Sequence, residues 1–260
     1  MNSNTPTANP NSTSAAPDPF STHPELRDKI TDPLTSFFRT FSAESVFAER
    51  PELSWVLDEL HSDEDREKTR AEALYGRMDN DLWVFAYGSL MWDPAFRFAD
   101  VRRAELPGYA RRFLLKDIYG GRGTKDNPGL MAGLDHGPSC EGLAFRIEEN
   151  HIETETEVLW RREMIGPGYI PTFVPLQIDG QDLEALTFVA DHSADSIDAS
   201  LTHQEQIRFI AHGSGFLGTS KEYLENIVAQ FAVLGIVDED CSALLADVEQ
   251  NMQSHPAKAT

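Results

Sequence analysis

Hydrophobic positions change their spacing several times along the chain. Residues 1–24 hold few apolar side chains among many Ser, Thr, Asn and Pro, and they predict a disordered tail. Residues 25–79 carry apolar residues at helical spacing, as in "LTSFFRTF" and "SDEDREKTRAEALYG", and predict a helical N-terminal extension. Denser apolar runs over 80–252 predict the main domain, which leaves 253–260 as a C-terminal tail.

Six short apolar runs in the main domain predict β-strands. They cover Trp83–Phe85, Ala110–Leu115, Leu130–Leu134, Glu141–Arg146, Phe173–Ile178 and Ala185–Ala190. Helical spacing predicts helices at about Glu149–Met164, Gln204–Ala211, Ser220–Leu234 and Asp240–Met252. Thr219 and Glu222 predict a capping box for the third of these helices. Because regular crossover helices do not separate the strands, we expect an α+β domain with a mixed or largely antiparallel sheet or small barrel.

Composition narrows the classes of partner. The chain has 43 Asp and Glu against 22 Lys and Arg, which gives a formal net charge of −21. Such a charge repels phosphate backbones and anionic lipids, so we expect no nucleic acid and no membrane as partner. Two cysteines cannot build a disulfide framework, and no histidine pair has the i, i+4 spacing of a helical metal site. The chain also lacks a signal peptide and a membrane-length apolar run, so we expect a cytoplasmic protein without a metal.

The segment "WVFAYGSLMW" ends a strand-like run at an abrupt Gly-Ser break. Ser89 has three interpretations: a nucleophile, part of a phosphate cradle, or an ordinary turn residue. A nucleophile elbow requires Gly-x-Ser-x-Gly, and Tyr87 and Met91 occupy the two glycine positions here. The glycine-rich "GGRGTK" at 120–125 does not fit a phosphate loop either, because its threonine precedes its lysine.

One carboxylate falls on the buried face of a predicted helix. In "EENHIETETEVLWRREM", Ile152, Thr156, Leu159 and Glu163 stand at offsets of zero, four, seven and eleven. At about 100° per residue these positions form one narrow stripe. Because Ile152 and Leu159 must be buried, Glu163 is expected to point inward with them. Burial raises the pKa of a carboxyl, and such a group in a cleft can accept a proton near neutral pH.

A structural role for Glu163 stays open beside this one. Carboxylates are rarely buried without a partner. An ion pair with Arg111 or Arg112 would satisfy Glu163 at the end of its helix. The residues alone therefore offer a glycine-serine break with free backbone amides, one inward carboxylate and no obvious nucleophile.

Five motifs occur in the order of a known family. They are "WVFAYGSLMW" at 83–92, "GYARRF" at 108–113, "RGT" and "NPG" within 122–129, "LWRREM" at 159–164 and "GTSKEYLENI" at 218–227. Over about residues 82–248 the chain resembles the ChaC-type γ-glutamylcyclotransferases. The resemblance implies a small mixed or antiparallel β-barrel surrounded by helices, which places the family domain at 80–252. It also implies that the protein degrades intracellular glutathione to 5-oxoproline and cysteinylglycine without a cofactor.

The resemblance also assigns roles to residues. It implies that the α-amine of the γ-glutamyl unit attacks the side-chain carbonyl of the same unit, so the enzyme needs no nucleophile of its own. Glu163 then serves as general base and general acid. Consecutive backbone N–H groups bind the γ-glutamyl group, with Gly88 allowing close approach and Ser89 adding a hydroxyl. The implied binding segment comprises Val84, Phe85, Ala86, Tyr87, Gly88, Ser89 and Leu90.

Three further residues have open roles. Tyr223 in "KEYL" is either a hydrogen-bond donor near the reacting groups or a core aromatic residue. Arg112 either pairs with an acid, which we favour, or binds the glycyl carboxylate of glutathione. Arg122, in the glycine-rich loop, is the better candidate for that distal carboxylate.

Other substrates and functions also stay open. A related cyclotransferase acting on γ-glutamylamines or γ-glutamyl dipeptides would keep the same loop and the same glutamate. A non-catalytic regulator that binds a γ-glutamyl ligand or a partner protein is a different class, which the intact Glu163 and "YGSL" disfavour. The expected partner is glutathione, and the oligomeric state stays open between a monomer and a weak dimer.

Overall fold

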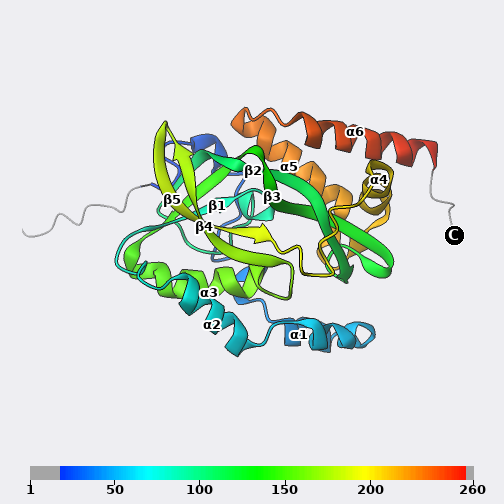
Figure 1. The fold of residues 1–260 in the computed structure, drawn as a ribbon, viewed down its shortest axis with the longest axis horizontal. Coiled ribbons are helices and arrows are strands. Elements are labelled where there is room, and N and C mark those ends of the chain that lie inside the picture. Colours follow the sequence, from blue (N-terminus) through cyan, green and yellow to red (C-terminus); the bar gives the residue numbers. More distant parts are fainter. Residues whose placement is uncertain (1–17, 256–260) are drawn as a thin grey trace, which may run out of the picture.

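A small β-barrel forms the centre of the computed structural model, which describes residues 18–255 and gives the barrel five strands (Figure 1). They are β1 (Leu82–Ala86), β2 (Asp100–Tyr119), β3 (Thr124–Ile147), β4 (Tyr169–Ile178) and β5 (Gln181–Ala190). The strand order is β1-β3-β2-β4-β5, and β5 closes the barrel by pairing in parallel with β1 and β3. The other pairings are antiparallel, so the prediction of a small mixed barrel in an α+β domain is confirmed.

The two longest strands, β2 and β3, form one hairpin that the sequence analysis divided into shorter pieces. The predicted strand 110–115 is the middle of β2, and the predicted strands 130–134 and 141–146 are both parts of β3. The prediction of six separate strands was therefore wrong. Register shifts, including one directly after Pro107, let the paired strands bend around the barrel without ending.

The N-terminal extension is helical but broken into five short elements between residues 18 and 79. They are η1 (Pro24–Leu26), η2 (Phe37–Thr40), α1 (Ala43–Ala48), η3 (Pro51–Glu59) and α2 (Asp63–Ala73), where η denotes a 3₁₀ helix. Residues 1–17 of the predicted disordered tail, and 256–260 of the predicted C-terminal tail, lie outside the described residues. Phe20, within the predicted disordered tail, packs edge-on against Phe98 with 5.6 Å between ring centroids.

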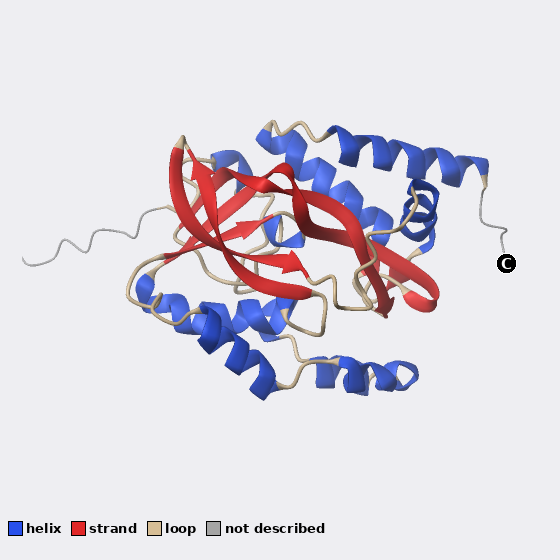
Figure 2. Ribbon diagram, in the orientation of Figure 1, coloured by secondary structure: helices blue, strands red, loops and turns tan. Residues whose placement is uncertain are grey.

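Helices pack on two sides of the barrel. The remaining ones are η4 (Ser89–Met91), η5 (Glu149–His151), α3 (Ile152–Glu163), α4 (His203–His212), α5 (Ser220–Leu234) and α6 (Glu239–Ser254). In Figures 1 and 2, α4, α5 and α6 lie on one side of the strands, and α1, α2 and α3 lie on the other. The predicted capping box of α5 is confirmed, because the Thr219 hydroxyl accepts from the Glu222 N–H and the Glu222 carboxylate accepts from the Thr219 N–H.

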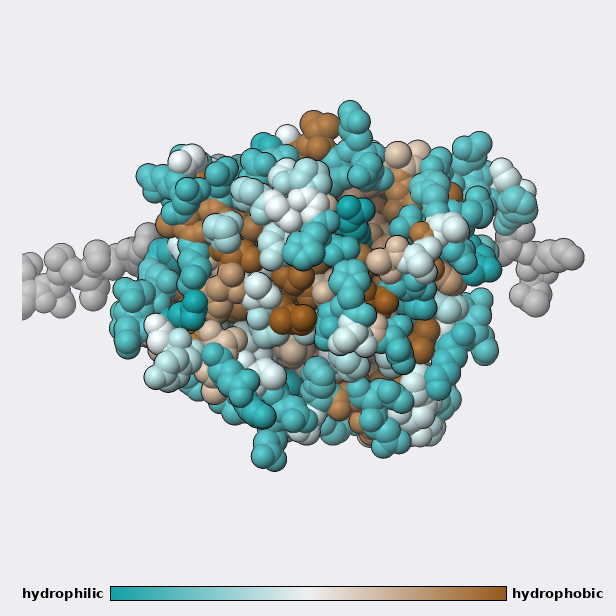
Figure 3. All heavy atoms as spheres, in the orientation of Figure 1, coloured by the Kyte–Doolittle hydropathy of each residue, from teal (hydrophilic) through white to brown (hydrophobic). Residues whose placement is uncertain are grey.

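The core lies inside the barrel and under its helices. Leu224 and Ile227 of α5 are fully buried against the strands, together with Val84 of β1 and Phe145 of β3. Each such side chain contributes about 1.5–3 kcal/mol through burial. On the face shown in Figure 3, hydrophilic residues cover the rim and apolar residues show in the centre. Within residues 18–255, no helix has both the length and the apolar character needed to cross a membrane.

Candidate active site

A cavity of about 210 Å³ opens beside the C-terminal end of α3. Four elements that are distant in sequence bring polar side chains to it: Glu163 from α3, Ser89 from η4, Tyr169 from β4 and Tyr223 from α5. The remaining wall is largely apolar and includes Met131 of β3. A few convergent polar groups in an otherwise apolar concave site are typical of a small-molecule pocket.

Glu163 is the last residue of α3, and its side chain is 14% exposed. Ile152, Thr156 and Leu159 are fully buried, so the stripe that the sequence predicted does face the core. Burial raises the pKa of the Glu163 carboxyl above its usual range, and the adjacent Arg162 opposes this rise. A carboxyl with a raised pKa at the edge of a cavity is suited to exchange protons with a bound molecule.

The predicted ion pair of Glu163 with Arg111 or Arg112 is not formed. Arg111 donates to Asp238 at 2.7 Å and to the Tyr87 carbonyl at 2.6 Å, and it forms its ion pair with Asp238. Arg112 lies 3.9 Å from Asp135 and is half exposed. Glu163 instead pairs with its own neighbour in sequence, Arg162.

Arg162 connects Glu163 and Ser89 at the edge of the cavity. Its Nε donates to Glu163 Oε1 at 3.1 Å, and its Nη2 donates to Ser89 Oγ at 3.0 Å. Its Nη1 donates to the Asp93 carbonyl, and the guanidinium carbon lies 4.2 Å from the ring centroid of Phe38. With 3% of its side chain exposed, Arg162 is a fixed positive charge that holds both Glu163 and Ser89.

Ser89 begins η4, the 3₁₀ turn that follows β1. Its oxygen accepts a hydrogen bond from Arg162, which leaves the hydroxyl hydrogen available to a molecule in the cavity. A guanidinium is a permanent cation and cannot act as the base that a serine nucleophile requires. The nucleophile interpretation of Ser89 therefore lacks its base, whereas a positioning role fits the geometry.

The other side-chain-bearing residues of the predicted binding segment do not line the cavity. Val84, Phe85, Ala86, Tyr87 and Leu90 are buried in the core. The Tyr87 hydroxyl donates to the Phe188 carbonyl at 2.8 Å. Ser89 is the one member of the segment whose atoms line the cavity. Contact between the other members and a ligand would thus run through the backbone, where the first N–H groups of η4 have no partner inside the turn.

Gly88 and Tyr223 lie in direct contact. A Cβ atom at position 88 would stand 2.6 Å from the Tyr223 hydroxyl, well inside van der Waals distance. Tyr223 is itself 4% exposed, and burial raises its pKa to about 12, so the phenol stays protonated and can donate. The close approach that the sequence predicted for Gly88 is therefore made by a protein side chain.

We expect Gly88→Ala to destabilise the fold by about 1–3 kcal/mol, because the new methyl group meets the Tyr223 hydroxyl. Thermal unfolding of wild type and variant measures the change. Combining Gly88→Ala with Tyr223→Phe removes the clashing oxygen and should restore most of the loss. An unchanged unfolding temperature for the single variant would show that Tyr223 moves aside freely.

Arg122, which the sequence analysis assigned to the distal carboxylate of glutathione, is not among the residues that line the cavity. Its Nη1 donates to the Thr219 carbonyl at 2.9 Å, and its guanidinium lies 5.2 Å from the ring centroid of Tyr223. Burial lowers the pKa of Arg122, although nearby Tyr223, Glu222 and Asp117 oppose that effect. Its position behind Tyr223 suits it to orient the phenol.

Residues 82–251 match the family model described as ChaC-like protein. The chain belongs to the ChaC-like family. The family that the five motifs predicted is thus confirmed.

Relatives of this ChaC-like chain carry names of glutathione-specific cyclotransferases. The glutathione-specific γ-glutamylcyclotransferase of Escherichia coli (strain K12) is 36% identical over 193 residues, or 74% of this chain and 83% of that protein. Glutathione-specific γ-glutamylcyclotransferase 1 of Homo sapiens is 32% identical over 160 residues, or 58% of this chain and 72% of that protein. A crystal structure of a γ-glutamyl cyclotransferase specific to glutathione from yeast has a TM-score of 0.62 at 22% identity, covering 68% of this chain and 99% of that one, and supports the fold.

Sequence reasoning missed three residues at the site of this ChaC-like protein. Arg162 stands beside Glu163 in "LWRREM", and Tyr169 follows the "GPG" turn, so each is next to a motif that the sequence analysis named. Phe38 lies outside the residues that match the ChaC-like family and has no local signal. Tertiary contact alone brings it to Arg162.

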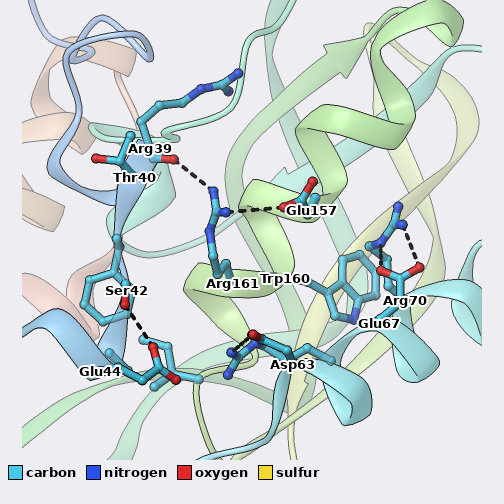
Figure 4. Close-up of a pocket in the computed structure, with 14 residues that line it drawn as sticks. Arg39, Thr40, Ser42, Glu44, Asp63, Glu67, Arg70, Glu157, Trp160 and Arg161 are labelled. Atoms are coloured by element: carbon cyan, nitrogen blue, oxygen red, sulfur yellow. Dashed lines mark hydrogen bonds and ion pairs between the residues drawn. The ribbon is translucent and has the colours of Figure 1, made fainter.

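A second and larger hollow, of about 610 Å³, lies between η2, α1, α2 and α3 of the ChaC-like protein (Figure 4). Each arginine that lines it is ion-paired: Arg39 with Glu155, Arg66 with Asp63, Arg70 with Glu67, and Arg161 with Glu157. Because these charges are already balanced, the hollow is a poor site for an anionic substrate. The smaller cavity beside Glu163 is the better candidate active site.

Proposed function

We propose that this protein is a γ-glutamylcyclotransferase that cleaves glutathione into 5-oxoproline and cysteinylglycine. The observation that carries the proposal is the meeting of Glu163, Ser89 and Tyr223 in one cavity of a ChaC-like fold. The E. coli and human relatives are named glutathione-specific γ-glutamylcyclotransferases, which supports the proposal.

The reaction needs little covalent help from the protein. The α-nitrogen of the γ-glutamyl unit bonds to the side-chain carbonyl carbon, and the bond from that carbon to the cysteinyl nitrogen breaks. Both reacting atoms belong to one molecule, so holding the chain bent supplies much of the acceleration through orientation. The cavity beside α3 is where the γ-glutamyl unit is held in such a bent form.

Glu163 is the proposed general base. An α-amine with a pKa of about 8 is mostly protonated at neutral pH and must lose a proton before it attacks. The Glu163 carboxylate takes that proton and gives it to the departing cysteinyl nitrogen. The attacking nitrogen loses a second proton as the lactam closes, and this proton passes to the same departing nitrogen, which leaves as an ammonium while Glu163 returns to its carboxylate form. The raised pKa of Glu163 brings the group closer to working pH, which favours transfer in both directions.

The α-carboxylate of the substrate and the oxyanion that forms during the reaction both find hydrogen-bond donors in the cavity. Arg162 provides a positive charge and the Ser89 hydroxyl a donor for the γ-glutamyl α-carboxylate, beside the N–H groups that begin η4. The protonated phenol of Tyr223 is placed to donate to the oxyanion that forms on the attacked carbonyl.

A panel of substrates tests this proposal. Release of 5-oxoproline is measured with glutathione, γ-Glu-Ala and γ-glutamyl-ε-lysine, and glutathione is expected to react fastest. Preference for the lysine derivative would favour the related γ-glutamylamine activity, and turnover of none would favour a regulator that only binds. A cytoplasmic location and a monomer or weak dimer stay predictions, which fractionation and analytical ultracentrifugation can check.

We expect Ser89→Ala to lower kcat/KM for glutathione by up to about tenfold. The variant loses one neutral hydrogen bond, worth about 0.5–1.5 kcal/mol, but keeps the backbone donors. Ser139→Ala, at an exposed position of β3, is the matched control. Complete inactivity of Ser89→Ala, with a covalent intermediate trapped on the wild-type serine in mass spectra, would revive the nucleophile interpretation.

A further inference from the structure

Part of the cavity wall comes from the N-terminal extension. Six residues between positions 38 and 60 line the cavity: Phe38, Phe41, Phe47, Val56, Glu59 and Leu60. All of them precede residue 82, where the match to the ChaC-like family begins. We call residues 36–61 the N-terminal wall.

The N-terminal wall is anchored at both ends. At one end, Arg39 binds Glu155 of α3 through both carboxylate oxygens, and Arg161 donates to the Arg39 carbonyl at 2.9 Å (Figure 4). Glu155 is fully buried and also accepts from Arg97, so this contact is desolvated and hydrogen-bonded. At the other end, the His61 N–H donates to the Ile165 carbonyl at 2.9 Å.

Between these anchors, aromatic residues of the wall pack against Tyr119 of β2 and against Phe216. The ring of Phe47 meets Phe216 edge-on with 6.1 Å between centroids. The ring centroids of Trp55 and Tyr119 lie 5.9 Å apart, and the Lys125 ammonium lies over the same indole, 3.3 Å from its centroid. These contacts hold the middle of the wall against Tyr119, Lys125 and Phe216.

The chemistry of the cavity divides into two parts. The charged γ-glutamyl head matches Arg162, Ser89 and Glu163, which lie together. The part of the substrate beyond the scissile bond takes up the rest of the cavity, whose lining includes Phe38, Phe41 and Phe47 of the wall. A thiol behaves as a small hydrophobe and packs well on aromatic rings, whereas a hydroxyl would lose water against these rings without finding a partner among them.

We infer that the N-terminal wall forms the subsite for the residue that follows the γ-glutamyl unit and selects a small apolar side chain such as that of cysteine. This inference rests on the proposed function. The wall has a second effect, because Phe38 packs on Arg162 and so restrains the group that holds Glu163. Phe38 is therefore both a specificity-determining and a positioning residue.

The test varies only the second residue of a tripeptide. We measure kcat and KM of the full chain for γ-Glu-Cys-Gly, γ-Glu-Ser-Gly and γ-Glu-Lys-Gly. Wild type should prefer cysteine over serine by about tenfold and over lysine by about a hundredfold or more, as expected for an apolar pocket. Phe38→Ala should reduce the cysteine-to-serine preference to less than about threefold, and Phe38→Leu should retain most of it.

A control separates selection from simple loss of structure. Leu57 is on the same segment, 38% exposed and outside the cavity lining, so Leu57→Ala should leave the preference unchanged. If Phe38→Ala lowers kcat/KM by one factor for all three peptides, the wall is only structural and the inference fails. A wild type that does not prefer cysteine overturns it as well.

A binding measurement keeps this result distinct from failure of the proposed function. Titration calorimetry with the same peptides on Glu163→Gln gives affinities that need no turnover. If wild type releases no 5-oxoproline but affinity follows the order cysteine, serine, lysine and loses that order in the added Phe38→Ala variant, the proposed reaction fails and the subsite stands. Equal affinities for the three peptides would overturn the subsite whatever the turnover.

Discussion

Replacing Glu163 by glutamine is expected to lower kcat for glutathione by about 10²–10⁴-fold while leaving KM within about threefold of wild type. Glutamine keeps the volume of the side chain and can still accept from Arg162, but it cannot take a proton from the attacking amine. Rates of 5-oxoproline release over a range of glutathione concentrations give both constants. Glu157→Gln, on the same helix with 60% of its side chain exposed, is the matched control and should be neutral.

A wild-type rate in Glu163→Gln would mean that another group is the base. The pH dependence provides a second check. Burial holds the pKa of Glu163 above 4.5, so activity should fall at acid pH with a midpoint above that of a free glutamate.

The raised pKa also predicts how stability depends on pH. A carboxyl whose pKa is higher in the folded than in the unfolded protein favours the folded state at low pH, and this contribution is lost as pH rises through the folded pKa. Glu163→Gln should therefore be more stable than wild type at neutral pH, with the difference vanishing below about pH 4.5.

Arg162→Met is expected to lower kcat/KM for glutathione by about 10²–10³-fold. The variant removes two charge-assisted contacts at once, to Glu163 and to Ser89, each worth about 1.5–3 kcal/mol. It also removes the positive charge that opposes burial at Glu163, so the acid limb of the pH–rate profile should move to higher pH. A profile that does not move would show that Arg162 acts on substrate alone.

Two variants help to interpret this result. Arg162→Lys keeps the charge but cannot span Glu163, Ser89 and the Asp93 carbonyl with one rigid fork, so it should recover activity only in part. Arg112→Met removes an arginine that is 54% exposed and remote from Glu163, and it should be close to wild type. Equal losses in Arg112→Met and Arg162→Met would indicate a general effect of lost positive charge on this acidic protein.

Local signals predicted the parts of the structure that local chemistry determines. Thr219 and Glu222 fixed the start of α5 because a capping box joins residues three apart. The stripe from Ile152 to Glu163 found the inward carboxylate because helical period alone sets which face is buried. The same period places Glu155 beside that stripe, and its burial could have been inferred from its offset of three from Ile152.

Long-range contacts account for what the sequence did not predict. Pro107 and Gly108 are typical of a strand end, but pairing with β3 continues β2 through them. Arg162 lies about 100° from Glu163 on the helix, and its long side chain reaches back in a way that no helical wheel shows. Phe38 reaches the cavity only because Arg39 and Glu155, 116 residues apart, meet in the folded chain.

That separation has a consequence for how the protein becomes active during synthesis. Residue 39 leaves the ribosome long before residue 155, and at 5–20 residues per second the delay is about 6–23 s. For that time the aromatic residues of the N-terminal wall have no helix to dock on and are open to solvent and to chaperones. The cavity can be completed only once α3 has emerged, so a nascent chain that is released before α3 has the wall without the site that it covers.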